Sequence, residues 1–322
     1  MLLVDIEKSL GAFRLRAQLR AEGEMLALLG ASGSGKSMTL QCIAGIERPD
    51  RGHIELDGRV LFDSEKKIDL PPQQRHVGYL FQNYALFPNM TVRENVACCV
   101  RNRKERQAQT DALLRRFRLT GLEDRHPRQL SGGEQQRTAL ARIFASKPSV
   151  ILLDEPLSAL DEFLRRELAQ QIFDLLSDFD GSVIWVTHDA QEALSVCKNV
   201  CVLENGQSSG IFPTQTLFSD PQTAAQARLA GLRNLYRCEN GFLPELGLHL
   251  PFGNGTVCIP PEAVIPGGDL HCVCIRTANG NALLRPVGLS DAPPLYTGLP
   301  AERGQTLSVC IEPSLLRFFP DA

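Results

Sequence analysis

The stretch Gly30-Ala31-Ser32-Gly33-Ser34-Gly35-Lys36-Ser37 decides the fold. It matches the pattern G-x-x-x-x-G-K-[ST] in full, an apolar run (Met25–Leu29) precedes it, and a helical pattern over residues 36–43 follows. In this setting the glycines turn backbone N–H groups inward, and the helix aims its positive end at the same anion. A glycine-rich turn without a ligand is the alternative, but strand, loop, Lys-Ser and helix together argue against it. The sequence therefore predicts a binding site for a nucleoside triphosphate.

The same stretch predicts ATP and Mg²⁺ as the ligands. Lys36 is expected to reach the β- and γ-phosphates, and Ser37 is expected to offer its hydroxyl to Mg²⁺. We expect the nucleotide to contact Gly30, Ala31, Ser32, Gly33, Ser34, Gly35, Lys36, Ser37 and Met38.

A second apolar run, Val-Ile-Leu-Leu at positions 150–153, ends in Asp154 and Glu155. A buried strand that ends in adjacent acids places them at the carboxyl edge of the sheet, where α/β proteins bind their ligands. We expect Asp154 to hold Mg²⁺ and Glu155 to polarise the attacking water. Such an ending is often only the end of a strand, but together with the phosphate loop it predicts hydrolysis.

About twenty residues before those acids stands Leu130-Ser131-Gly132-Gly133-Glu134. Ser131 is typical of a helix N-cap, and the two glycines expose backbone N–H groups at the positive end of the helix predicted over residues 133–146. An ordinary capped helix is the alternative, although it would not need two glycines. The pattern indicates a second anion site on the same chain.

Apolar runs alternate with helical patterns through the first two-thirds of the 322 residues. This alternation is typical of an α/β domain, and runs rich in Val, Ile and Leu suit a mostly parallel sheet covered by helices. Residues 2–20 and 52–80 instead alternate polar and apolar, with a turn at Leu56-Asp57-Gly58-Arg59, which predicts an antiparallel layer attached to the parallel core. The expected strands are residues 25–29, 77–81, 149–153, 183–187 and 200–203, and the expected helices are residues 36–43, 106–117, 133–146, 162–179 and 190–197.

The composition changes near residue 231, where glycine and proline become frequent and helical periodicity disappears. We therefore predict two domains, residues 1–230 and a small all-β domain over residues 231–322, with a helical stretch at 221–230 leading into the second.

Charge and apolar patterning exclude several classes of protein. The net charge of -3 argues against nucleic acid as the main partner. Nothing approaches the roughly 18–20 consecutive apolar residues of a membrane span, and the amino end does not have the pattern of a secretory signal. The protein is therefore expected in the cytoplasm, reaching a membrane only through a partner.

The 10 cysteines are scattered and form no Cys-x-x-Cys pair. His271-Cys272-Val273-Cys274 could supply metal ligands, but the segment alternates like a strand, so both cysteines are expected to face the apolar side. Reduced, mostly buried thiols are the expectation.

With these motifs in order, the chain resembles the ATP-binding subunit of an ABC (ATP-binding cassette) transporter over roughly residues 1–230. Six spaced motifs make the resemblance specific. They are the phosphate loop at residues 30–37, Gln82 in Phe-Gln-Asn, the signature at residues 130–134, the strand and acids at residues 150–155, Asp161 in Ser-Ala-Leu-Asp, and His188 in Val-Thr-His-Asp.

The resemblance implies a head-to-tail homodimer in which the signature of one copy, Ser131, Gly132, Gly133 and Glu134, completes the ATP site of the other. It further implies that Gln82 joins the Mg²⁺ ligands Ser37 and Asp154 and senses the γ-phosphate. His188 would hold the attacking water beside Glu155. Asp161 would connect the two sites across the interface. Phe13 is a candidate for stacking on adenine, with core packing as the alternative.

The implied partners are integral membrane permease subunits and, through them, a substrate-binding protein, at the cytoplasmic face of the membrane. The segment at residues 82–96 carries apolar Tyr84, Leu86, Phe87 and Pro88 and is expected to dock a membrane subunit, with a helical-subdomain core as the alternative.

The hairpin at residues 56–63 and the stretch at residues 70–79 resemble those of molybdate importers. Sulfate, iron and polyamine importers share much of this pattern, and all carry a small β-domain at the carboxyl end. Here that domain resembles a degenerate TOBE/Mop-like module. Molybdate import is the expected function, with the other three cargoes as alternatives.

Two further classes fit less well. Cassette ATPases that act on ribosomes or DNA usually carry two cassettes or a long coiled-coil insertion, and this chain shows neither. An ordinary phosphate-loop kinase would lack the signature and the histidine motif.

Overall fold

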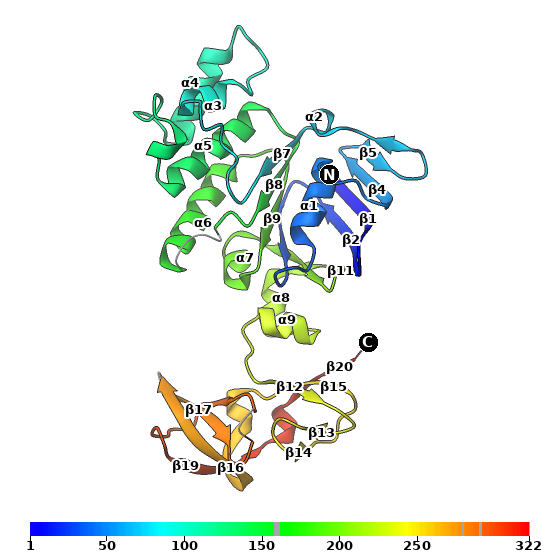
Figure 1. The fold of residues 1–322 in the computed structure, drawn as a ribbon, viewed down its shortest axis with the longest axis vertical. Helices are drawn as coiled ribbons and strands as arrows, with labels where there is room; N and C mark the ends of the chain where they lie inside the picture. Colours follow the sequence, from blue (N-terminus) through cyan, green and yellow to red (C-terminus); the bar gives the residue numbers. More distant parts are fainter. Residues whose placement is uncertain (158–161, 279, 290–291, 322) are drawn as a thin grey trace. The chain divides into compact units, whose positions relative to one another are not determined.

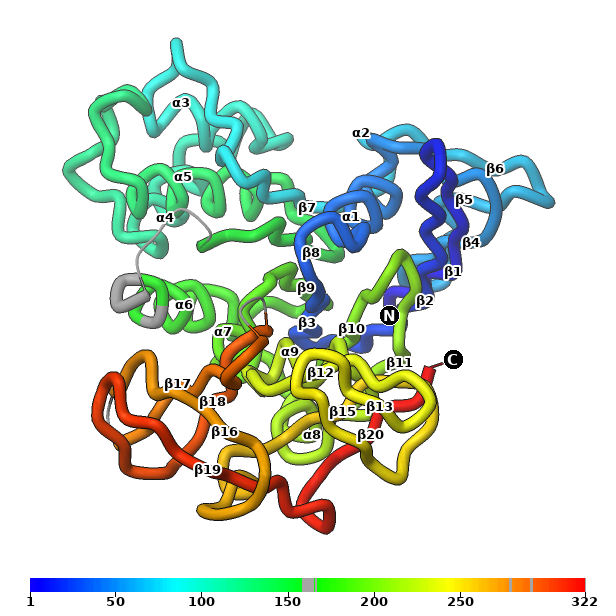
Figure 2. The backbone as a smooth tube through the Cα atoms, turned by 60° about the horizontal axis from the view of Figure 1, so that its bottom comes forward, coloured from blue at the N-terminus to red at the C-terminus, as the bar shows by residue number. Residues whose placement is uncertain are grey.

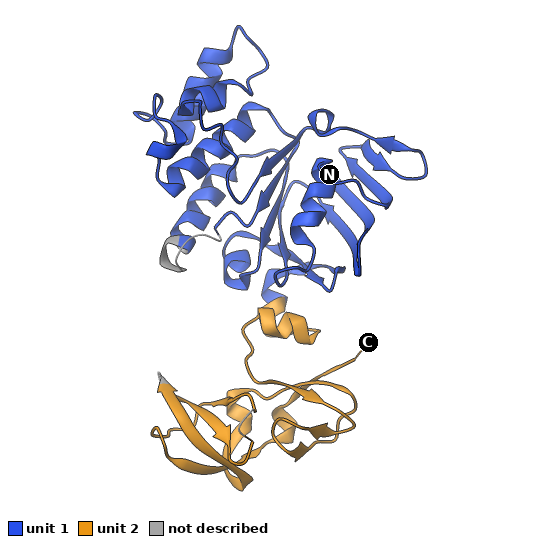
Figure 3. Ribbon diagram, in the orientation of Figure 1, with its two compact units in different colours: residues 1–216 blue, residues 217–322 orange. Residues whose placement is uncertain are grey.

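The computed structural model describes residues 1–157, 162–278, 280–289 and 292–321. The chain forms two compact units, Met1–Thr216 and Leu217–Ala322 (Figure 3). The division falls within helix α8 (Thr214–Ser219).

Unit 1 is built on one mixed sheet of eleven strands (Figure 1). A parallel block carries the strands that were expected from the apolar runs, and an antiparallel block carries the amino-terminal hairpin and the strands after residue 50. In spatial order the strands are β6 (Ile68–Asp69), β5 (Arg59–Asp63), β4 (Arg51–Leu56), β1 (Leu2–Leu10), β2 (Phe13–Ala21), β11 (Gln207–Pro213), β10 (Asn199–Glu204), β3 (Met25–Leu29), β9 (Ser182–Thr187), β8 (Val150–Asp154) and β7 (Val77–Leu80).

The predicted antiparallel layer is therefore continuous with the parallel core. Strand β11 joins the two blocks, because it pairs antiparallel with β10 and meets β2 through the pair Gln207 and Arg16. The hairpin turn lies where it was predicted. Asp57 and Gly58 have φ of 52° and 78°, the left-handed pair of a type I′ two-residue hairpin.

Helix α1 (Lys36–Ala44) packs against one face of this sheet. Its Leu40 and Ile43 share one core cluster with Leu26 of β3, Leu152 of β8 and Ile184 of β9, and with side chains of β1, β2, β4 and β5. The alternate residues of β3, β8 and β9 are buried on the other face, which explains why these runs are apolar at every position.

Helix α5 (Gly132–Ala145) covers the opposite face of strand β7. Val77 and Tyr79 of that strand pack on the core that holds α1, whereas a Cβ on Gly78 would lie 2.4 Å from Cγ2 of Ile143 in α5. Figures 1 and 2 show α5 in a helical lobe with α3 and α4, on the other side of β7 and β8 from α1. The remaining helices of unit 1 are α2 (Pro72–Arg75), α3 (Val92–Ala97), α4 (Arg106–Arg116), α6 (Glu162–Leu176) and α7 (Ala190–Val196).

Unit 2 confirms the prediction of a small all-β domain. After α9 (Ala224–Leu229), its strands form sheets with their own apolar core. The sheets are β12 (Leu235–Cys238), β15 (Gly255–Cys258) and β20 (Arg317–Pro320); β13 (Phe242–Leu243) and β14 (Leu248–His249); and β18 (Leu295–Thr297), β17 (Asn281–Pro286), β16 (Val264–Ala278) and β19 (Thr306–Ile311).

The cysteines of the His-Cys-Val-Cys stretch lie on one face of β16, as predicted. Cys272 and Cys274 are buried in the core of unit 2, whereas His271 is exposed and its Nδ1 lies 2.8 Å from Oγ of Ser308. Within the described ranges, no helix is long and apolar enough to cross a membrane.

Candidate functional site

The predicted phosphate loop connects β3 to α1 and depends on close backbone packing. Gly35 has φ of 105°, and a Cβ there would lie 2.9 Å from Leu15 and 3.1 Å from the ring of Phe13. A Cβ on Gly30 would lie 2.4 Å from the carbonyl oxygen of Leu203 in β10. The half-buried Phe13 thus lies against the loop and also packs on the core.

Lys36 crosses the inside of the loop. Its side chain is only 4% exposed, and Nζ donates to the carbonyl oxygens of Gly30 and Ala31, each at 2.9 Å. Burial lowers the pKa of Lys36, and the charges of Glu155 and Asp154 oppose that shift. The ammonium group is therefore held among backbone oxygens, with two carboxylates nearby.

Asp154, at the end of β8, accepts two hydrogen bonds. Oγ of Ser37 donates to Oδ1 and the hydroxyl of Tyr79 donates to Oδ2, both at 2.8 Å. The serine hydroxyl and the carboxylate are hard oxygen ligands, the kind that Mg²⁺ prefers. The structure thus brings together Ser37 and Asp154, which the sequence placed 117 residues apart.

Ser34 provides a test of whether the loop fits a phosphate. Its side chain is 7% exposed, and its Oγ has no hydrogen-bond partner within the described part of the chain. A buried hydroxyl without a partner is costly, and a phosphate oxygen would satisfy it. The loop therefore fits the triphosphate that the sequence predicts.

Glu155 and His188 meet beside Lys36. Oε1 of Glu155 lies 3.6 Å from Nδ1 of His188 and 3.8 Å from Nζ of Lys36. The backbone of Glu155 has φ of 46°, and its N–H donates to the carbonyl of Val186 in the neighbouring strand β9. The predicted base and the predicted histidine are thus adjacent, at the carboxyl ends of β8 and β9.

Glu192, which the sequence analysis did not single out, accepts hydrogen bonds from two residues that precede His188 in the chain. Oε1 of Glu192 accepts from Nε1 of Trp185 at 2.6 Å, and Oε2 accepts from Oγ1 of Thr187 at 3.1 Å. Burial raises the pKa of this carboxyl group. Asp189 then caps α7 by accepting from the N–H groups of Gln191 and Glu192.

The predicted signature forms a closed capping box at the start of α5. Oγ of Ser131 accepts from the N–H of Glu134, and Oε2 of Glu134 accepts from the N–H of Ser131 at 2.7 Å. The hydrogen bonds that the N–H and the hydroxyl of Ser131 donate to this carboxylate lower the pKa of Glu134. Because α5 and α1 lie on opposite faces of β7, the structure does not join the signature to the phosphate loop of the same chain.

The remaining predicted residues are spread around this site. Gln82 is exposed, two residues beyond the end of β7, and Met38 of α1 packs partly buried on the core. Asp161 lies outside the described residues.

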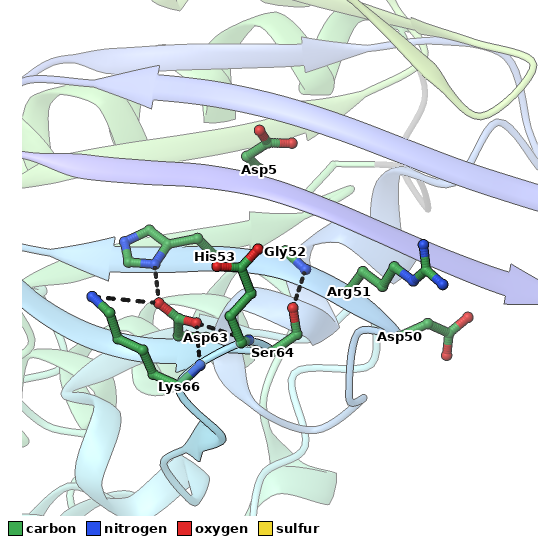
Figure 4. A pocket seen from close by; sticks show the side chains of 9 residues that line it. Asp5, Asp50, Arg51, Gly52, His53, Asp63, Ser64 and Lys66 are labelled. Carbon is green, nitrogen blue, oxygen red and sulfur yellow. Dashed lines mark hydrogen bonds and ion pairs between the residues drawn. The ribbon is translucent and has the colours of Figure 1, made fainter.

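A separate cavity of about 780 Å³ opens on the antiparallel block (Figure 4). Asp5, Asp50, His53, Asp63 and Glu65 are among the residues that line it. None of the predicted site residues does so. Asp63, which lies in the lining, already accepts from the N–H groups of Glu65 and Lys66 and lies 3.2 Å from Nδ1 of His53. The cavity does not belong to the nucleotide site.

Tyr79 is a second residue that sequence reasoning missed, and replacing it with phenylalanine tests its role. The change removes the hydrogen bond to Asp154, so we expect Mg²⁺ binding to weaken several-fold and the free energy of unfolding to fall by about 1–2 kcal/mol. Urea unfolding and titration of Mg²⁺ in the presence of ATP measure both effects. Tyr296→Phe in unit 2 is the matched control. Unchanged Mg²⁺ binding would show that Tyr79 only fills space.

Comparisons with known proteins agree with this geometry. The family model for ABC transporters matches residues 17–158. The spermidine/putrescine import ATP-binding protein PotA of Methylococcus capsulatus is 44% identical over 218 residues, which cover 66% of this chain and 55% of that protein. The molybdenum import ATP-binding protein ModC of Paramagnetospirillum magneticum is 39% identical, covering 69% and 61%. The Fe(3+) ions import ATP-binding protein FbpC of Haemophilus influenzae is 38% identical, covering 74% and 72%.

Among solved structures, the dimeric ATP-binding cassette MJ0796, bound to ADP and Pi in a post-hydrolysis state, matches with a TM-score of 0.55 and 28% identity. The match covers 66% of this chain and 99% of the cassette. The chain thus spans a whole cassette but little more than half the length of some relatives.

Proposed function

The chain belongs to the ABC transporter family, and from this premise we propose that it hydrolyses ATP to drive import through separate membrane subunits. The observation that supports this most is the meeting of Lys36, Ser37, Asp154, Glu155 and His188 at the carboxyl ends of neighbouring strands. Each of these side chains matches one step of binding or hydrolysing a triphosphate.

In this proposal Lys36 and the loop N–H groups bind the phosphates, and Ser34 donates its free hydroxyl. Ser37 and Asp154 would hold Mg²⁺, with Gln82 as a further ligand, and the charge that a bound Mg²⁺ supplies would offset that of the phosphates. Glu155 accepts the proton of the attacking water, and His188, 3.6 Å from it, orients that water. Phe13, beside Gly35, stacks on the adenine.

The second half of the site comes from another copy of the chain. The N–H groups of Gly132 and Gly133 at the start of α5 form an anion site. This site is separate from the phosphate loop of the same chain, so the phosphate that it binds would belong to a nucleotide on a second copy. The dimer of MJ0796 supports a similar assembly here. Asp161 links the two sites across the interface.

Replacing Ser131 with arginine tests this sharing. We expect hydrolysis to fall by at least about 100-fold, because a bulky side chain blocks the anion site that stabilises transferred charge, while a single chain still binds ATP. Phosphate release and equilibrium binding of a fluorescent ATP analogue measure the two quantities.

Ser131→Asn is the matched control, since asparagine caps helices as well as serine does. Loss of nucleotide binding in Ser131→Arg would instead place Ser131 in the ATP site of its own chain.

The proposed cargo is molybdate, and the proposed location is the cytoplasmic face of the membrane, bound to permease subunits through residues 82–96. The hairpin at residues 56–63 and the similarity to ModC support molybdate, whereas PotA and FbpC match over comparable lengths. Unit 2 is proposed to be an accessory module of the TOBE type, with the functional cassette ending near residue 230.

Reconstitution with a permease and a substrate-binding protein that copurify with the chain tests the cargo. We expect ATP turnover to rise only when the binding protein is loaded with molybdate. If sulfate, Fe³⁺ or spermidine stimulates ATP turnover instead, that ligand is the cargo and not molybdate. If no ligand gives turnover, the proposal that the chain drives import is rejected.

A further inference from the structure

The segment after Gln82 has a rare backbone conformation. Tyr84 and Ala85 are consecutive residues with φ of 59° and 44°. Side chains with a Cβ seldom adopt this left-handed region, and two in succession are rarer still. Such a conformation persists only where surrounding groups hold it in place.

Arg142 of α5 is the group that holds it. Its Nη1 donates to the carbonyl oxygen of Ala85 at 2.8 Å, and its Nη2 donates to that of Tyr84 at 3.1 Å. The guanidinium carbon also lies 5.2 Å from the centre of the Phe87 ring. The planar fork thus contacts both left-handed residues and the aromatic ring that follows.

Burial shows that this contact is not a chance surface pairing. Arg142 is half-buried, and desolvation lowers the pKa of its guanidinium group. Withdrawing a cation from water is unfavourable unless its donors are bonded, and here two backbone oxygens bond them.

Asn95 of α3 fixes the far end of the same segment. The side chain is fully buried; its Oδ1 accepts from the N–H of Phe87 at 2.9 Å. Its Nδ2 donates to the carbonyls of Phe87, Met90 and Thr91. Asn95 therefore anchors the backbone of residues 87–91 by hydrogen bonds. The carbonyl groups of Tyr84 and Ala85, close to Gln82, are instead held by Arg142.

Arg142 also lies on the helix that Ser131 begins, about 16 Å along its axis. Helix α5 packs against β7 beside Gly78. One rigid helix thus carries the signature at its start and the contact to the Gln82 segment near its end.

We propose that Arg142 is the positioning residue for Gln82: it holds the left-handed pair Tyr84–Ala85 and so transmits the position of α5 to the glutamine. This rests on the proposed function for the role of Gln82, whereas the hold itself is a property of the folded chain.

The test uses Arg142→Ala in the full chain. Turnover is expected to fall about 10- to 100-fold, because even a small displacement of Gln82 from the reacting groups slows the reaction. The KM for Mg²⁺–ATP is expected to stay unchanged, because the phosphate loop lies on the other face of β7. The N–H groups of Tyr84 and Ala85, bonded to Phe81 and Asn83, should exchange with solvent at least about tenfold faster. The N–H of Phe87, bonded to Asn95, should keep its protection.

Arg116→Ala is the matched control. Arg116 also lies in the helical lobe, donates to a backbone carbonyl, that of Leu175, at 3.0 Å, and stacks on an aromatic ring, that of Phe144, at 4.8 Å. If Arg142→Ala changes exchange and turnover no more than Arg116→Ala does, the inference is overturned. Arg142→Lys, which keeps the charge without the planar fork, is expected to give intermediate exchange and serves if the alanine variant does not fold.

A rescue separates positioning from general stability. Adding Ala85→Gly to Arg142→Ala removes the strain at one left-handed residue, so turnover should recover at least partly. If turnover does not recover in the double variant, Arg142 does not act by holding the left-handed pair. A wild-type chain without ATP turnover would reject the proposed function, yet the exchange measurements would still decide whether Arg142 holds the segment.

Discussion

Replacing Glu155 with glutamine is expected to lower steady-state ATP turnover by about 10²- to 10⁴-fold. The amide keeps the shape of the carboxylate but does not accept a proton from water. It also loses the charge that faces His188 and Lys36. Because the phosphate loop is untouched, ATP should still bind, and the ATP-bound dimer should accumulate. Phosphate release and size-exclusion chromatography with Mg²⁺–ATP measure the two outcomes.

Glu167→Gln is the control for this experiment, because Glu167 is an exposed residue of α6. It should leave turnover and assembly unchanged. Wild-type turnover in the Glu155→Gln chain would remove Glu155 as the base.

Replacing Lys36 with alanine is expected to weaken ATP binding by about 100-fold or more, since the ammonium group makes charge-assisted bonds to phosphate oxygens. Thermal unfolding measures this directly. A ligand at 100 times its Kd stabilises the folded state by about 2.7 kcal/mol, so Mg²⁺–ATP should raise the Tm of the wild type but not that of the variant.

The same variant has a second signature without nucleotide. Burial lowers the pKa of Lys36 below its usual 10.5, so between the two values the unfolded chain binds more protons than the folded chain. Stability of the wild type therefore rises with pH in that window, and the cost of burying the ammonium is present in full below it. Relative to Lys36→Ala, the wild type should gain stability as the pH approaches 10.5.

Lys147→Ala, at an exposed lysine after α5, is the control for both measurements. A Tm of the Lys36→Ala chain that still rises normally with Mg²⁺–ATP would show that Lys36 does not bind the phosphates.

Local patterns predicted the elements that carry the site. A few consecutive residues are enough to predict each of three elements: the strand at Met25–Leu29, the start of α1 at Lys-Ser, and the strand that ends in Asp154. Boundaries differ by a residue or a few, as where α5 begins at Gly132 directly after its cap. The turn at Asp57-Gly58 was readable because only a few residue types adopt that backbone.

The groups that support the site were not predictable in the same way. Tyr79 reaches Asp154 only because β7 pairs in parallel with β8, and Arg142 reaches Tyr84 from 58 residues away. Glu192 looks like an ordinary polar helix residue until Trp185 is seen to donate to it. These contacts depend on how distant segments pack, which no local periodicity encodes.

The closed capping box of Ser131 and Glu134 bears on the thermodynamics of assembly. Both side chains already bond each other and the first turn of α5 within a single chain, so this surface is ordered before any second copy arrives. Association through a preorganised surface loses little conformational entropy, and two such surfaces dock nearly as rigid bodies. Calorimetry of dimer formation should accordingly show a heat-capacity change set by buried apolar area, without the larger contribution that accompanies folding on binding.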